Sequence, residues 1–178
     1  YHCEFCNVID IFEHTYRTKT LEQIERELDA LYELGYRGQV DFFDDNLIGN
    51  FNKAKPLLRL LADWLARHNY PFFFSTSVTL NIAKDDEILR LLREARFKAF
   101  LVGIESPDTN ALKTALKPQN TGFSITEAVD RIYTIAGATV HSGFLIGLDG
   151  ESTDIGDRII KCIEDTSIPW VMAGIVYP

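Results

Sequence analysis

The stretch Ala99-Phe-Leu-Val-Gly-Ile-Glu105 is an apolar run that ends on a carboxylate. Short runs of this kind, bounded by turn residues, are typical of buried strands. Similar runs lie near residues 41, 73, 143 and 173, and segments with helical periodicity follow all but the last, which gives a repeat of roughly thirty residues. A strand followed by a helix, repeated along the chain, predicts an α/β fold with a parallel sheet.

The clearest expected helix begins after Thr20. Thr20 and Gln23 have the spacing of a capping box, leucines and isoleucines follow on one face, and Gly35 ends the segment. Pro56 is tolerable in its helix if it lies in the first turn. The expected helices are 20–34, 54–67, 85–95, 107–116, 124–136 and 154–165, and the expected strands are 40–43, 71–77, 99–105, 139–147 and 170–177.

Two features favour a barrel over an open doubly wound sheet. No strand is followed by the Gly-x-Gly-x-x-Gly loop of dinucleotide-binding sheets. Polar residues gather where strands are expected to end, which is where β/α barrels assemble their sites. A complete eight-fold barrel needs about 250 residues, so a chain of 178 residues suits a partial one. The polar residues are Asp44, Asp45, Ser75, Ser77, Glu105 and Asp149.

Composition limits the class of protein. A content of 46% hydrophobic and 25% charged residues is ordinary for one globular domain. No apolar run reaches the roughly 18–20 residues that a transmembrane helix needs, and the net charge of −8 argues against a nucleic-acid partner. Three cysteines make no disulfide framework and predict a cytoplasmic protein, with Cys162 packed in a helix.

Cys3 and Cys6 are separated by two residues at the start of the chain. This spacing lets both thiols bind one metal centre. It also suits a disulfide or redox pair, two ordinary buried cysteines, or half of a zinc site completed by His2 and His14. The spacing alone leaves these alternatives open.

The segment Cys3-Glu-Phe-Cys6 resembles the end of the radical SAM signature, Cys-x3-Cys-x-aromatic-Cys, whose three thiolates hold a 4Fe-4S cluster. The first cysteine of that motif would precede Tyr1, which indicates a chain cut inside the motif or a natural degenerate copy. The continuation Asn7-Val-Ile-Asp-Ile-Phe resembles the cobalamin-binding radical SAM subgroup that includes hopanoid C-methylases. The resemblance implies that residues 1–178 are a radical SAM core domain from a larger protein. Its fold would be a partial (β/α)6 TIM-like barrel whose first strand is missing from this chain.

The resemblance also implies an activity. The core would bind a 4Fe-4S cluster and S-adenosylmethionine (SAM) and generate a 5′-deoxyadenosyl radical, for methyl transfer to carbon or a related reaction. An electron donor such as a ferredoxin or flavodoxin and a small-molecule or lipid-like substrate would be the partners. Cobalamin would belong to a separate domain of the parent protein. We expect the chain alone to be inactive, because two thiolates hold a cluster less securely than three.

Several positions match the family's SAM site. Phe5 corresponds to an aromatic residue near the adenine, and Asp44 and Asp45 lie where a Gly-Gly-Glu segment usually meets the methionyl ammonium, although the two glycines are absent. Ser75 and Ser77 end the next expected strand on the same side.

The later strands supply the remaining SAM candidates. Glu105 corresponds to a residue for the ribose or methionyl end, and Lys117 to a basic partner of the carboxylate. Leu145, Ile146 and Gly147 resemble a Gly-x-Ile-x-Gly segment that contacts adenine, with Leu145 in place of isoleucine and Asp149 where many relatives have proline.

Other readings of these residues remain. The chain could be a non-catalytic β/α scaffold or zinc-binding domain, or a metal-free barrel enzyme with Asp44, Asp45 and Glu105 as acid and base. Asp45 and Glu105 could also be helix caps, and Lys117 a solvated surface residue. His141 is expected to be structural, as a lone histidine usually is.

Overall fold

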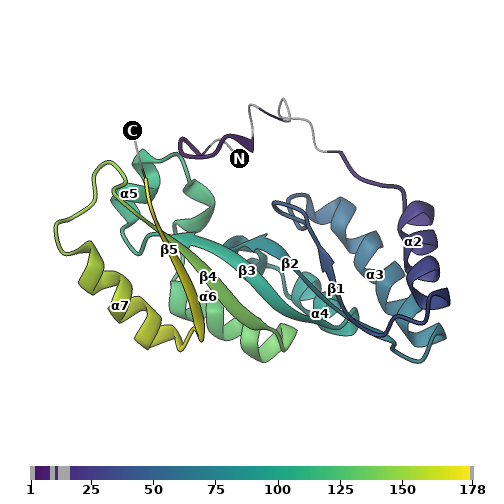
Figure 1. Cartoon of the computed structure of the whole chain (residues 1–178). Coiled ribbons are helices and arrows are strands. Elements are labelled where there is room, and N and C mark those ends of the chain that lie inside the picture. Colours follow the sequence, from purple (N-terminus) through teal and green to yellow (C-terminus); the bar gives the residue numbers. More distant parts are fainter. Residues whose placement is uncertain (1–2, 9–10, 12–16, 177–178) are drawn as a thin grey trace.

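A computed structural model of the chain describes residues 3–8, 11 and 17–176 and has five parallel strands in the order β1-β2-β3-β4-β5. The sheet curls into a half-barrel (Figure 1), which confirms the predicted α/β partial barrel. Neighbouring strands are joined by crossover connections, as parallel pairing requires, and they follow one another in sequence order. The strands are β1 (Gly38–Phe42), β2 (Phe72–Thr79), β3 (Phe97–Glu105), β4 (Thr139–Ile146) and β5 (Trp170–Ile175).

Helices cover the convex side of this sheet (Figure 1). They are α2 (Leu21–Glu33), α3 (Phe51–Arg67), α4 (Asp86–Glu94), α6 (Ile125–Arg131), which continues as the π-helical turn η3 (Ile132–Ala136), and α7 (Ile155–Thr166). The short helix α5 (Thr109–Thr114) and the 3₁₀ turns η1 (Leu80–Lys84) and η2 (Pro118–Asn120) complete the chain. No helix in the described ranges is long and apolar enough to cross a membrane.

Strand β2 shows how the core is divided. Its residues alternate between buried and half-buried, because successive side chains point to opposite faces of a strand. Phe72, Phe74 and Val78 face the helices and are almost completely buried. The residues between them face the concave side. On that side β3 contributes Leu101 and β5 contributes Trp170 and Met172, and all three side chains are exposed.

The helix boundaries follow the expected caps with one correction. Thr20 and Gln23 form the predicted capping box. Helix α3 begins at Phe51, three residues before the expected start, because Asn50 caps it by accepting from Lys53 N–H. Pro56 therefore lies in the second turn, so the condition of a first-turn proline is not met and the expected start at Ala54 was wrong.

Candidate functional site

The cysteine loop lies against α5 (Figure 1). Glu4 N–H donates to the carbonyl of Ala115 at 3.2 Å, and Cys6 N–H donates to the carbonyl of Cys3 at 3.1 Å, which curls the loop into a turn. Phe5, between the two cysteines, packs against a small apolar cluster that contains Ala111, Ala115 and Leu148. Both thiols are free and half-buried, and both cysteines lie on one tight turn that is bonded to the end of α5.

A buried ion pair lies beneath this loop. Lys117 Nζ donates to Glu105 Oε1, with side-chain exposures of only 5% and 13%. The same Nζ lies 5.7 Å from the centre of the Phe5 ring, so the pair reaches the cysteine loop. The solvated-surface reading of Lys117 was therefore wrong: the turn after α5 folds the side chain inward.

Two backbone features make room for the pair. Glu105 has φ +68°, a left-handed conformation that is rare for glutamate and that ends strand β3. A Cβ at Gly103 would overlap Glu105 Oε1 and lie 3.0 Å from Lys117 Nζ. The absence of a Cβ at Gly103 therefore lets these two charged groups approach the backbone of β3 closely.

The η2 turn links the ion pair to the cysteines. Asn120 donates its amide hydrogens to the carbonyl oxygens of Gly103 (2.7 Å) and Ile104 (3.1 Å). Gln119 Nε2 lies 3.5 Å from Cys3 Sγ. The side-chain oxygens of Gln119 and Asn120 are buried, and neither has a hydrogen-bond partner within the described part of the chain.

The segment after β4 has two different faces. Leu145 packs in the same cluster as Phe5, whereas Ile146 packs against the main core on the helix side. The Ile146 side chain therefore points away from the cysteine loop. Gly147 has φ +94° and donates its N–H to Glu151 Oε2 at 2.8 Å, which fixes the turn that follows.

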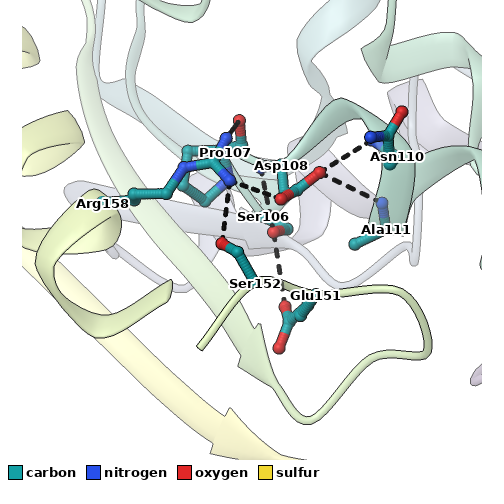
Figure 2. Close-up of polar contacts among 8 residues, drawn as sticks. All are labelled: Ser106, Pro107, Asp108, Asn110, Ala111, Glu151, Ser152 and Arg158. Carbon is teal, nitrogen blue, oxygen red and sulfur yellow. Dashed lines mark hydrogen bonds and ion pairs between the residues drawn. The ribbon is translucent and has the colours of Figure 1, made fainter. Parts of the chain in front are cut away.

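A network of polar contacts braces this turn against the start of α5 (Figure 2). Arg158 donates to Asp108, to Ser152 Oγ at 3.0 Å and to the carbonyl of Pro107 at 3.3 Å. Ser106 Oγ donates to Glu151 Oε1 at 3.4 Å.

Asp108 carries the negative charge at the centre of this polar network. Its carboxylate caps α5 by accepting from the backbone N–H groups of Asn110 and Ala111. Desolvation favours the neutral acid, but these two hydrogen bonds and the Arg158 guanidinium together outweigh it and lower the pKa of Asp108. The negative charge is therefore held in a largely buried position.

The candidates near β1 and β2 lie apart from this cluster. Asp44 and Asp45 follow β1, two strands away from β3, and are exposed. Although Asp44 is exposed as a whole residue, desolvation of its carboxyl group, and then the negative charge of Asp45, raise the pKa of Asp44. The carbonyl of Ser77 accepts Leu47 N–H at 3.2 Å, which ties this loop to β2.

Ser75 does not end a strand, so that expectation was wrong. Strand β2 continues to Thr79, and Ser75 lies in the middle of the strand, where it pairs with Asp41 on β1 and Ala99 on β3. Its hydroxyl group donates to Asp41 and accepts from Gln39 Nε2 at 3.1 Å.

The structure thus brings Cys3, Phe5, Glu105, Lys117 and Leu145 into one cluster. Sequence reasoning missed Gln119, Asn120, Asp108 and Arg158. A turn-forming Pro-x-Asn pattern marks η2, but nothing local identifies what its side chains touch.

The described residues hold no group of three or more His, Cys, Asp or Glu side chains placed to bind a metal ion. His2 and His14, the other ligands of the zinc alternative, lie outside the described residues.

Comparisons with known proteins agree with the fold and the motifs. The model of the Radical SAM superfamily matches residues 1–162. An uncharacterized methyltransferase of Synechocystis is 44% identical over 95% of this chain, and the hopanoid C-2 methylase of Rhodopseudomonas palustris is 43% identical over the same share. The chain spans about a third of each relative, 31% and 32% of their lengths.

Solved structures give the same fold. The radical SAM methyltransferase TsrM from Kitasatospora setae, with cobalamin and a [4Fe-4S] cluster bound, superposes with a TM-score of 0.83 at 17% identity. That match covers 98% of this chain and 34% of TsrM.

Proposed function

This chain belongs to the radical SAM superfamily, and we propose that it forms the part of a carbon methyltransferase that holds a 4Fe-4S cluster and SAM. The observation that carries the proposal is the docking of the cysteine loop onto the buried Glu105–Lys117 pair at the carboxyl end of β3. This is the edge at which β/α barrels place their sites. The two relatives at 43–44% identity, one named a methyltransferase and one a hopanoid C-2 methylase, support the reaction class.

The cysteine loop fits a cluster in its donor chemistry. Thiolates are the ligands of Fe–S clusters, and Cys3 and Cys6 are free, half-buried and joined by one turn. A third thiolate would come from the cysteine that the family motif places ahead of Tyr1. When bound, such a cluster supplies one electron for the reductive cleavage of SAM, which starts radical chemistry.

The residues around the loop fit the parts of SAM. Phe5 and Leu145 offer an apolar surface for the adenine, and the Gly147 backbone allows close approach. Two buried acceptors without partners in the described ranges, on Gln119 and Asn120, suit a ligand that carries ammonium and hydroxyl donors.

The charged groups can hold the methionyl end. Lys117 would bind the carboxylate and Glu105 the ribose or the ammonium. Asp44 and Asp45 would add negative charge for the ammonium, with Ser77 beside them. Ser75 and Ile146 are poor candidates, since Ser75 lies deeper in the sheet and Ile146 faces the core.

An apolar concave face supports the proposed class of substrate. Leu101, Trp170 and Met172 leave an apolar surface exposed inside the half-barrel, which suits a small or lipid-like molecule. Cobalamin, if the parent protein uses it, would be held by a separate domain, and a ferredoxin or flavodoxin would be the electron donor.

Metal analysis tests the proposal. This chain and a version extended upstream through the expected first cysteine are reconstituted anaerobically and assayed for iron, sulfide and zinc. We expect about four irons per extended chain and a visible absorption that bleaches on reduction. Replacing Cys3 and Cys6 by serine should abolish both signals. Zinc without iron, or no metal in either protein, would instead favour the zinc-binding or scaffold reading.

A further inference from the structure

The η2 turn places Gln119 next to the cysteine loop, and the proposed function gives the amide nitrogen of Gln119 no role. Gln119 Nε2 lies 3.5 Å from Cys3 Sγ, although the two residues are 116 positions apart in the chain. Hydrogen bonds to sulfur are longer than those to oxygen because sulfur is the larger atom. The Gln119 amide is therefore at donor distance from a proposed cluster ligand.

The residues on either side hold Gln119 in place. Lys117 N–H donates to the carbonyl of Leu112 at 2.8 Å, and its side chain pairs with Glu105 on β3. Asn120 donates to two carbonyl oxygens of β3. Pro118 restricts the backbone between them. The amide is consequently fixed to the same strand that positions the ion pair.

The orientation of the amide is also informative. Its nitrogen faces the sulfur, while its oxygen is buried and has no partner among the described residues. A buried amide oxygen without a partner is unfavourable, so an apolar side chain would suit a purely packing role better. The amide thus directs its N–H group toward Cys3 and leaves its oxygen for the ligand donor proposed above.

We propose that Gln119 is a positioning residue that donates a hydrogen bond to the Cys3 thiolate and thereby raises the reduction potential of the bound cluster. This inference rests on the proposed function. Reduction adds one negative charge to the cluster and its ligands, and an N–H dipole directed at a sulfur ligand stabilises that charge. Removing the donor should therefore make the cluster harder to reduce.

The test uses the cluster-loaded protein that includes the first cysteine, titrated with reductant and followed by EPR. Gln119→Leu removes the donor, and Gln119→Glu replaces it with a negative charge. We expect the midpoint potential to fall in the first variant and to fall further in the second. Thr121→Val is the matched control, because Thr121 Oγ1 donates to Pro118 O at 2.8 Å on the same turn but not to sulfur.

A second measurement works on the unsubstituted protein. Glutamine side chains are labelled with ¹⁵N, and pulsed EPR of the reduced cluster is expected to show a ¹⁵N coupling. This result decides the matter if the Gln119 variants fail to hold a cluster. Unchanged potentials in both variants, or no ¹⁵N coupling, overturn the role of Gln119 alone. If the unsubstituted protein assembles no cluster, that result contradicts both the proposed function and the role of Gln119.

Discussion

At Gly103 the backbone of β3 passes directly beneath the Glu105–Lys117 pair. We expect Gly103→Ala to separate the pair and to lower the free energy of unfolding by about 1–3 kcal/mol, the usual cost of overpacking. Urea unfolding measures the change. Gly143→Ala is the matched control, because Gly143 is the register partner of Gly103 on β4 and a Cβ there meets nothing within 4 Å. Equal losses in the two variants would contradict the argument.

The ion pair itself supports a second prediction. Lys117→Met leaves Glu105 buried without its partner, so we expect a loss of about 3–5 kcal/mol in the free energy of unfolding. Adding Glu105→Gln to that variant should restore part of the loss, because no unpaired charge then remains buried. The control is Lys161→Met, which breaks an exposed pair with Asp165 and should cost no more than about 0.5 kcal/mol. A double variant no more stable than Lys117→Met would argue against a charge effect.

Cys162 differs in reactivity from an exposed cysteine. Burial, and then the nearby charge of Asp165, raise the pKa of the Cys162 thiol to about 11. At pH 8 its thiolate fraction is on the order of one in a thousand, and the thiolate is the reactive form. We expect iodoacetamide to label Cys162 slowly in the folded protein and rapidly after unfolding in guanidinium chloride, as followed by peptide mass spectrometry. Equal rates in the two states would show that burial does not protect this thiol.

At the scale of elements, the polar network around Asp108 joins the start of α5 to the turn after β4. Asp108→Asn keeps a capping acceptor but removes the charge that pairs with Arg158. The pKa of Asp108 is lowered in the folded state, so its charge contributes stability above the ordinary aspartate pKa of about 3.9. That contribution is lost as the pH falls through the lower folded value.

We therefore expect Asp108→Asn to cost about 1 kcal/mol at pH 7, since Arg158 is partly exposed, and less at pH 3. Urea unfolding at the two pH values measures both losses. Asp165→Asn, which affects an exposed pair on α7, is the control and should change little at either pH. A loss of stability in Asp108→Asn that is larger at pH 3 than at pH 7 would contradict the lowered pKa of Asp108.

At the scale of the whole molecule, the half-barrel leaves its concave face open. Trp170 and Met172 on β5 are 48% and 51% exposed, and β5 is an edge strand of the described sheet. Exposed apolar patches bind apolar dyes and promote association. We expect the 178-residue chain to bind anilinonaphthalene sulfonate, and Trp170→Gln with Met172→Gln to reduce that fluorescence. Ile160→Gln, on the exposed side of α7, should leave it unchanged; a comparable decrease there would show that the dye does not report the concave face.

The sequence by itself determined the repeating architecture. Strand runs, helical periodicity and caps such as Thr20 are local signals, because each depends on residues a few positions apart. They predicted the five strands and the main helices, and the Cys3–Cys6 motif indicated the family. Boundaries that depend on a neighbouring segment were missed, as at Pro56 and at the continuation of β2 beyond Ser77.

Only the tertiary structure decided which side chains meet. Lys117 pairs with Glu105 because the turn after α5 folds back over β3, and Gln119 faces Cys3 across 116 residues of chain. Leu145 and Ile146 are adjacent in sequence, yet only Leu145 faces the cysteine loop. These contacts depend on how separate segments pack at one edge of the sheet, and no local pattern of residues records that packing.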